Sequence, residues 1–309
     1  MDFSLCERDG LVFTPDALAL GASYRDVTRA VRNGHLLRLR RGCYVLTEVW
    51  DAASPRERHL LRVRSVVRMA ERQIVLAGAS AAALWAVPLE DFPVEVTVID
   101  TWRGGGRSEP GVRRTARGAT SAHSVERDGY RCTTLARTVL EVSRELDFRS
   151  AVPILDWALS DRNPNRIDRA ELAGEAARMG LRARHSRAVT FANGESGSEG
   201  ESEARAVIHE LGFPSPQLQR RFVDEQGEMF TDFYWERFDA VVEFDGKLKY
   251  TRDRYTAGDP SEVVWREKKR EDRLRRKVRI VARVTSYEVK RPQLLAERLL
   301  EAGIRRSGQ

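Results

Sequence analysis

The chain has 309 residues, of which 41% are hydrophobic and 32% are charged, and it carries a formal net charge of +7. This length allows two or three domains with hydrophobic cores of their own, and the composition is that of a globular protein. The basic balance, with a pI near 9.6, favours an anionic partner, of which nucleic acid is the commonest.

Cysteine usage and hydropathy narrow the class of protein further. Cys6, Cys43 and Cys132 are scattered and form no CxxC pair, which argues against a disulfide framework or a thiolate zinc site. The start, MDFSLCERDG, lacks the apolar core of a signal peptide, and no stretch approaches the roughly 20 apolar residues of a membrane helix. We therefore expect a soluble protein of the cytoplasm that has no membrane partner.

Residues 1–50 predict two short helices followed by a β-ribbon. One helix is predicted to begin at Thr14 and end at Gly21, and a second, capped by Ser23, to span Tyr24–Arg32. Two short helices joined by a glycine-containing turn are typical of a helix-turn-helix, and the alternating LLRLRRGCYVL that follows predicts a basic wing. The alternative is an ordinary helical hairpin with a solvated basic face. The predicted DNA contacts lie on the second helix and the wing: Arg25, Thr28, Arg29, Arg32, Arg38, Arg40 and Arg41.

Residues 51–160 predict a mixed region of helices and strands. Residues 56–72 form a basic helix with apolar side chains at helical spacing, Ser80–Trp85 continues helical, and Val94–Ile99 alternates like a strand. Val139–Leu159 predicts a pair of helices with apolar stripes. The loop Trp102–Arg107 lacks the spacing of a phosphate-binding loop and is expected to be a flexible basic loop that could touch the DNA backbone. Three isolated histidines are expected on the surface or in the core rather than as metal ligands: His59, His123 and His185.

A polar stretch rich in glycine and serine, residues 161–199, is expected to be a helical or flexible linker. After it, residues 200–309 predict a helix, three strands, a helix, a strand and a final helix. The second and third strands form a hairpin within Phe230–Tyr250 that is rich in aromatic and β-branched residues.

Acidic residues interrupt this hairpin in places where a plain core hairpin would not have them. A turn near Arg237 sets Asp232 opposite Glu243, and Asp245 projects from the same face because it lies two residues further on. Lys247 follows by another two. Three carboxylates and a lysine at one strand end are costly unless a cation or a substrate uses them. The alternative is that the acids are turn or edge-strand residues of a solvated sheet.

The N-terminal pattern resembles a known family. The order of a helix, GxS, a helix ending in NG, and LxRLRRGCY resembles the winged-helix domain of the AbiEi family of antitoxin regulators, and AGASAAALWAVP and TTLARTVLEV extend the resemblance. In that family the domain binds operator DNA and represses its own operon. The resemblance therefore implies double-stranded DNA as a partner, and a nucleotidyltransferase-like toxin as a further partner if a neighbouring gene encodes one.

A second resemblance covers roughly residues 196–305. GESEAR, FPSPQLQ, TDFYWE, VVEFDGKLKY and EKKREDRLR resemble, in this order, the PD-(D/E)XK nuclease-like domains related to the very-short-patch-repair endonuclease. The resemblance implies an αβββαβ restriction-endonuclease-like core and DNA phosphodiester hydrolysis that depends on Mg²⁺ or Mn²⁺.

The resemblance also implies roles for particular residues. Asp232 and Glu243 match the first and second acids, while EFDGK stands where the signature has E-x-K. Either Asp245 is an additional metal ligand and Lys247 or Lys249 reaches back, or the site has drifted. The remaining implied position is a supporting helix acid, Glu201, with Glu203 as the fallback. Side chains on the charged helix are expected to approach either the site or the scissile phosphate: Lys268, Arg270 and Asp272. The alternative for that helix is a solvated face.

The sequence thus predicts an α/β protein, α+β overall, in four segments. These are a winged helix-turn-helix (1–50), an AbiEi-like α/β middle domain (51–160), the linker (161–199) and a restriction-endonuclease-like domain (200–309). The predicted function is DNA binding with Mg²⁺-dependent DNA cleavage. The alternative is a non-enzymatic antitoxin and autorepressor with an inactive nuclease-like domain.

Overall fold

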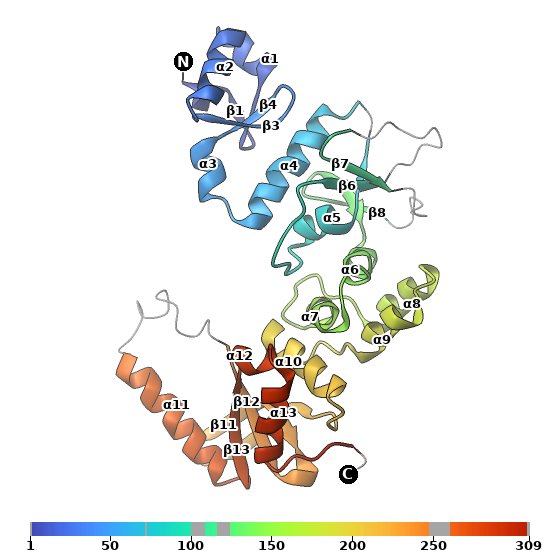
Figure 1. Cartoon of the computed structure of the whole chain (residues 1–309), viewed down its shortest axis with the longest axis vertical. Coiled ribbons are helices and arrows are strands. Elements are labelled where there is room, and N and C mark those ends of the chain that lie inside the picture. Colours follow the sequence, from blue (N-terminus) through green and yellow to red (C-terminus); the bar gives the residue numbers. More distant parts are fainter. Residues whose placement is uncertain (1, 72, 100–108, 116–123, 247–259, 308–309) are drawn as a thin grey trace. The chain divides into compact units, whose positions relative to one another are not determined.

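The computed structural model describes residues 2–71, 73–99, 109–115, 124–246 and 260–307, without the side chains of 184, 260–264, 266 and 267. The chain folds as two compact units, unit 1 (Met1–Glu145) and unit 2 (Leu146–Gln309), coloured from blue to red along the sequence in Figure 1. The described residues form helices and three sheets, which confirms the mixed α/β class. The four segment boundaries expected from the sequence stay predictions.

The first part of unit 1 is a small helical module on a four-stranded sheet of order β1-β2-β4-β3. The predicted helix Tyr24–Arg32 is confirmed residue for residue, because Ser23 and Asp26 form a capping box at its start. The predicted ribbon is also confirmed, as the hairpin of β3 and β4. The elements are β1 (Glu7–Arg8), β2 (Leu11–Phe13), α1 (Thr14–Ala19), α2 (Tyr24–Arg32), β3 (Leu36–Arg40), β4 (Cys43–Leu46) and α3 (Thr47–Ala52).

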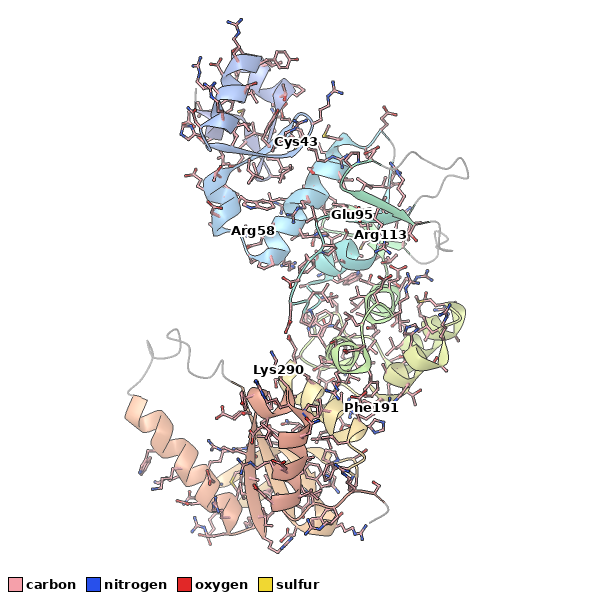
Figure 2. All side chains as sticks on the ribbon, in the orientation of Figure 1. Cys43, Arg58, Glu95, Arg113, Phe191 and Lys290 are labelled. Carbon is pink, nitrogen blue, oxygen red and sulfur yellow. The ribbon has the colours of Figure 1, made fainter. Side chains whose placement is uncertain are left out.

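The cysteines of unit 1 are buried free thiols. Cys43, labelled in Figure 2, opens β4 and is fully buried. Burial raises the pKa of the Cys43 and Cys132 thiols to about 11, so both stay protonated at neutral pH. These two cysteines therefore pack as small apolar side chains.

The second part of unit 1 is a five-stranded mixed sheet of order β7-β6-β5-β9-β8 with helices packed on it. Its apolar core includes Val63, Leu76, Leu84 and Val98. The predicted loop Trp102–Arg107 and His123 lie outside the described residues. The elements are α4 (Pro55–Met69), β5 (Val75–Leu76), α5 (Gly78–Trp85), β6 (Val96–Ile99), β7 (Val112–Thr115), β8 (Ser124–Arg127), β9 (Tyr130–Thr133) and α6 (Leu135–Ser143).

His59 is a core histidine of α4, as the sequence allowed. Its Nδ1 lies 2.9 Å from the Pro93 carbonyl oxygen and its Nε2 lies 3.0 Å from the Ser80 Oγ. The Pro93 carbonyl oxygen can only accept, so Nδ1 carries the proton of the neutral ring and the Ser80 hydroxyl donates to Nε2. The backbone N–H of Thr97 donates to the same Ser80 oxygen. Burial lowers the pKa of His59 from 6.5 to about 4.

Acid is therefore expected to destabilise unit 1 through His59. Because the folded-state pKa lies below the unfolded value, folding favours the neutral ring, and this stability is complete above the unfolded pKa and declines as the pH falls below it. Between about pH 7 and pH 4 the loss should approach 3 kcal/mol. Urea denaturation of the full chain at both pH values measures it. The His59→Gln variant should lack this part of the pH dependence, and an equal dependence in both proteins would contradict the assignment.

Unit 2 begins with helices that pack together ahead of a four-stranded sheet. The predicted order of a helix, three strands, a helix, a strand and a helix is the order observed from α10 to α13, with an extra short helix, α12. The elements are α7 (Phe148–Leu159), α8 (Arg169–Arg178), α9 (Ala183–Phe191), α10 (Glu199–Glu210), β10 (Gln217–Asp224), β11 (Gly227–Trp235), β12 (Ala240–Asp245), α11 (Pro260–Arg275), β13 (Ile280–Thr285), α12 (Ser286–Val289) and α13 (Pro292–Glu301).

The sheet of unit 2 has the order β10-β11-β12-β13, and helices cover both of its faces. Strands β10, β11 and β12 are antiparallel neighbours, whereas β13 runs parallel to β12. Apolar side chains of α10, α12 and α13 pack with Phe233, Val242 and Val284 on one face. Figure 1 shows α11 on the other side of the strands. Side chains along β11 and β12 point alternately to the two faces of the sheet, and many on both faces are buried because helices cover both faces.

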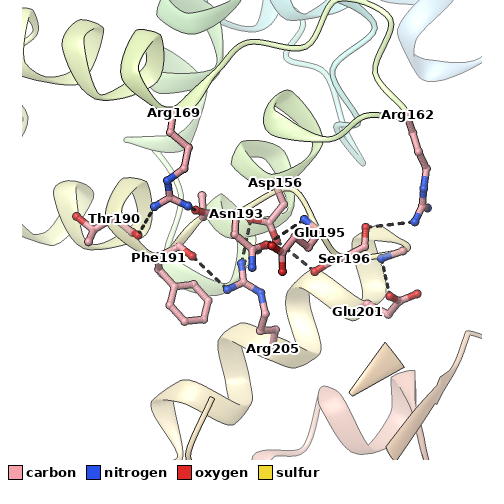
Figure 3. A network of polar contacts seen from close by, with 12 residues as sticks. Asp156, Arg162, Arg169, Thr190, Phe191, Asn193, Glu195, Ser196, Glu201 and Arg205 are labelled. Atoms are coloured by element: carbon pink, nitrogen blue, oxygen red, sulfur yellow. Dashed lines mark hydrogen bonds and ion pairs between the residues drawn. The ribbon is translucent and has the colours of Figure 1, made fainter. Parts of the chain in front are cut away.

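A buried ion pair joins α7 to α10 (Figure 3). Arg205 donates from Nη2 to both carboxylate oxygens of Asp156, at 2.9 and 2.8 Å. Its Nη1 donates to the Phe191 carbonyl oxygen, and its guanidinium lies 4.0 Å from the centroid of the Phe191 ring. The N–H of Asn193 donates to Asp156 as well. Residues 191–193, inside the expected linker, are thus held between two helices of unit 2.

Within the part of the chain that the structure describes, no helix has the length and apolar character needed to cross a membrane.

Candidate nucleic-acid interface and acidic sheet edge

The outer face of α2 is basic and exposed. Val27 and Ala30 are 4% and 6% exposed and fix the inner face of the helix. The Thr28 hydroxyl donates to the Tyr24 carbonyl oxygen at 2.8 Å, and Arg29 lies 3.7 Å from the Asp26 carboxylate. The four predicted contacts on this helix all lie on the exposed side: Arg25, Thr28, Arg29 and Arg32.

The wing is the β3–β4 hairpin, whose turn is Arg41-Gly42. Gly42 has a φ of +75°, a backbone conformation that suits glycine. Arg38 and Arg41 are exposed. Arg40 is different, because its Nη2 donates to Glu109 at 2.7 Å and only 17% of its side chain is exposed. Arg40 therefore holds the wing to the segment that precedes β7, and a DNA contact would have to compete with Glu109.

The acids predicted in unit 2 lie at one end of the pairing between β11 and β12. We call the group formed by Asp232, Glu243 and Glu201 the acidic edge. The β11–β12 register, with Phe233 opposite Val242, sets Asp232 opposite Glu243 when it is continued by one residue. The Oδ2 of Asp232 accepts a hydrogen bond from the Phe244 N–H at 2.8 Å, so the side chain is tied to the backbone of β12. On the other side, the β10–β11 register sets Gln219 opposite Asp232. The register of β11 and β12 therefore agrees with the predicted position of Asp232 opposite Glu243.

Glu201, in the first turn of α10, faces this edge. It is 8% exposed and accepts hydrogen bonds from the Gly197 N–H at 2.5 Å, the Ser198 hydroxyl at 2.9 Å and the Gln219 amide at 3.1 Å. Burial, followed by the charge of Asp232, raises the pKa of Glu201. Gln219 has a φ of +45°, unusual for a residue with a side chain. Sequence reasoning missed Gln219, since nothing in FPSPQLQ marks a left-handed residue.

Two arginines of α11 hold this helix against the sheet. Arg270 donates from Nη1 and Nη2 to the two oxygens of Glu243, at 2.8 and 3.3 Å, and also to the Phe230 carbonyl oxygen. Arg273 donates in the same forked way to Asp224 and to the Gly227 carbonyl oxygen. The Arg273 hydrogen bond lowers the pKa of Asp224 to about 2. Lys268, the other predicted phosphate contact of this helix, is exposed.

The acidic edge does not fit a magnesium ion in this arrangement. Asp232, Glu243 and Glu201 all accept hydrogen bonds from protein donors, whereas Mg²⁺ needs carboxylate oxygens turned toward it in near-octahedral geometry. Among the residues that the structure describes, no three acidic, histidine or cysteine side chains converge closely enough to hold a metal ion. Asp245 is half-buried at the end of β12, and Lys247 lies outside the described residues, as does Lys249. The metal and the catalytic roles stay predictions.

The N-terminal module is similar to a known family of regulators. Residues 7–47 match the family model described as "Transcriptional regulator, AbiEi antitoxin", and this stretch contains β1 to β4 with α1 and α2. Two Mycobacterium tuberculosis proteins, "Uncharacterized protein Rv2248" of strain H37Rv and "Uncharacterized protein MT2308" of strain CDC 1551, are each 30% identical over 248 residues, 76% of this chain and 85% of theirs. The chain belongs to the Rv2248 family.

This member of the Rv2248 family therefore begins with a regulator domain of the AbiEi antitoxin type, as the sequence resemblance implied. A solved structure, the crystal structure of RV2827C protein from Mycobacterium tuberculosis, covers 71% of the chain and 85% of its own length, at 15% identity and a TM-score of 0.39. That likeness is too weak to carry an argument. The resemblance of residues 196–305 to nuclease-like domains stays a prediction.

Proposed function

We propose that this member of the Rv2248 family is a transcriptional regulator of the AbiEi antitoxin type that binds double-stranded DNA through α2 and the β3–β4 wing. The observation that carries the proposal is the exposed outer face of α2, which presents Arg25, Arg29 and Arg32 on a helix whose opposite face is buried. The family match over residues 7–47 supports it. The net charge of +7 favours the same partner.

The chemistry of these side chains suits the major groove. In a helix-turn-helix the N-terminal residues of the second helix contact base edges, so Arg25 and Thr28 are positioned to read sequence. An arginine fork pairs with two acceptors of a guanine or with a phosphate. Arg38 and Arg41 of the wing would contact the sugar-phosphate backbone, which sets the register of the protein on DNA and adds affinity at low salt.

We further propose that the protein acts in the cytoplasm and represses transcription of its own gene. The purified full chain should shift the DNA directly upstream of its own coding sequence at lower concentration than a random duplex of equal length and base composition. A reporter gene under that upstream DNA should be repressed when the protein is expressed. Equal affinity for both duplexes together with an unrepressed reporter would refute self-repression. A neighbouring gene for a nucleotidyltransferase-like toxin would extend the proposal to a toxin–antitoxin pair.

Mg²⁺- or Mn²⁺-dependent DNA cleavage is the second candidate function, and it requires Arg270 to leave Glu243 so that a metal ion can bind there. The order α10-β10-β11-β12-α11-β13 is the order of elements that the resemblance of residues 196–305 implies, and Glu201 lies near Asp232, which the register sets opposite Glu243; both observations support this candidate. The test incubates plasmid and linear DNA with the full chain in Mg²⁺, Mn²⁺ or EDTA. Nicking that needs metal and disappears in both Asp232→Ala and Glu243→Ala supports cleavage, whereas intact DNA in every lane refutes it.

A further inference from the structure

The acidic edge of unit 2 already contains a positive charge. Arg270 reaches from α11 to Glu243 on β12 with two hydrogen bonds and to the Phe230 carbonyl oxygen on β11 with a third. Its guanidinium thus spans the two strands next to the point where Asp232 lies opposite Glu243. The side chain of Glu243 is 13% exposed and that of Arg270 is 32% exposed, so the pair is partly shielded from water.

A positive charge is needed at this position. Glu201 is buried near enough to Asp232 for the two carboxylates to repel each other, and Glu243 is the cross-strand neighbour of Asp232. Negative charges taken out of water need a counter-charge or donors. A forked arginine–carboxylate pair is among the strongest of such contacts, and it engages both oxygens that a metal ion would use.

We propose that Arg270 is a resident cation of the acidic edge and stands at Glu243 where a divalent metal ion would otherwise bind. The guanidinium of Arg270 then neutralises part of the negative charge of the acidic edge, and a divalent ion reaches Glu243 only when Arg270 is removed. This inference concerns unit 2 alone and does not depend on DNA binding by α2.

Arg273 offers a matched control because it clamps the same helix in the same way. It donates in a forked pair to Asp224 and to the Gly227 carbonyl oxygen, at the end of the β10–β11 hairpin. Changing Arg273 to glutamine loosens α11 from the sheet but leaves the charge at Glu243 in place. A change seen with Arg270→Gln and not with Arg273→Gln therefore reports the cation and not the clamp.

The test measures Mn²⁺ binding to the full chain, by isothermal titration and by the rise in Tm on adding Mn²⁺. Four proteins are compared: wild type, Arg270→Gln, Arg273→Gln and the double variant Arg270→Gln with Glu243→Gln. We expect Arg270→Gln to bind Mn²⁺ on the order of tenfold or more tightly than the other three, since only it has Glu243 without its forked partner. Its Tm without metal should be lowered, as should that of Arg273→Gln.

Two results would overturn the proposal. One is equal Mn²⁺ affinity in wild type and Arg270→Gln, whether both bind or neither does. The other is a gain in Arg273→Gln that matches the gain in Arg270→Gln. If Arg270→Gln does not fold, Arg270→Met replaces it, because a methionine keeps an apolar stem against the sheet but carries no charge to pair with Glu243. That variant should bind Mn²⁺ more tightly than wild type, and no gain there refutes the proposal equally.

Discussion

Replacing Asp156 by alanine is expected to lower the free energy of unfolding of unit 2 by about 3–5 kcal/mol. Asp156 and Arg205 are 2% and 6% exposed, so the substitution leaves a guanidinium buried without its carboxylate. It also removes the acceptor for the Asn193 N–H, which holds residues 191–193 in place (Figure 3). Urea denaturation of the full chain, with hydrogen exchange to assign the transition to unit 2, measures the loss.

The matched control is Asp161→Ala, which breaks another aspartate–arginine pair of unit 2. Asp161 and Arg166 are 85% and 60% exposed, so water replaces the lost contact and the cost should stay below about 1 kcal/mol. The paired replacement Asp156→Leu with Arg205→Met should recover much of the stability lost in Asp156→Ala, because no buried charge is left alone. An Asp156→Ala cost no larger than that of Asp161→Ala would contradict the structural role of the pair.

The triple variant Arg25→Ala, Arg29→Ala and Arg32→Ala is expected to bind double-stranded DNA at least about a hundredfold more weakly than wild type. Each arginine that neutralises a phosphate releases about one counterion, so the slope of log affinity against log salt should become shallower by about 2–3. Fluorescence anisotropy with a labelled duplex at several salt concentrations gives both values. Stability should change little, since all three side chains are exposed.

A control variant that loses the same charge elsewhere separates the effect of direct contacts between α2 and DNA from the effect of the net charge. Arg131, Arg276 and Arg305 are also exposed, and their triple replacement by alanine removes the same three charges from other parts of the chain. We expect this control to lose much less affinity and to keep most of the salt slope. If both triple variants weaken binding equally, α2 has no special role and the basic charge of the whole protein accounts for the affinity.

The sequence predicted those features whose cause is local. The ends of α2 follow from the capping Ser23 and the glycine after Asn33, both of which act within one helical turn. The pairing of Asp232 with Glu243 follows from the two-residue period of a strand once the turn near Arg237 is fixed. By contrast, β1 has two residues and β2 has three, too few to show any period.

The sequence could not predict the contacts that depend on packing between distant elements. Arg40 reads as a wing residue that faces DNA, yet it pairs with a glutamate 69 positions away. Arg270 is expected near the site or the scissile phosphate, but the sequence does not show that its partner is Glu243, 27 positions away. In both cases the helical or strand pattern sets the face of the residue, whereas its partner is set by how α11 or the wing packs. The acids and the helix that carries Arg270 were therefore found from sequence, and the ion pair between Arg270 and Glu243 was not.

Hydrogen exchange of the full chain, with and without duplex DNA from directly upstream of its own coding sequence, tests the central claim most directly. We expect DNA to slow exchange in α2 (Tyr24–Arg32) and in the β3–β4 wing, because these elements dock on the duplex. The arginine variant of α2 should lose that protection at the same DNA concentration. Protection confined to unit 2, with α2 and the wing unchanged, would contradict the claim that the protein binds DNA through its N-terminal module.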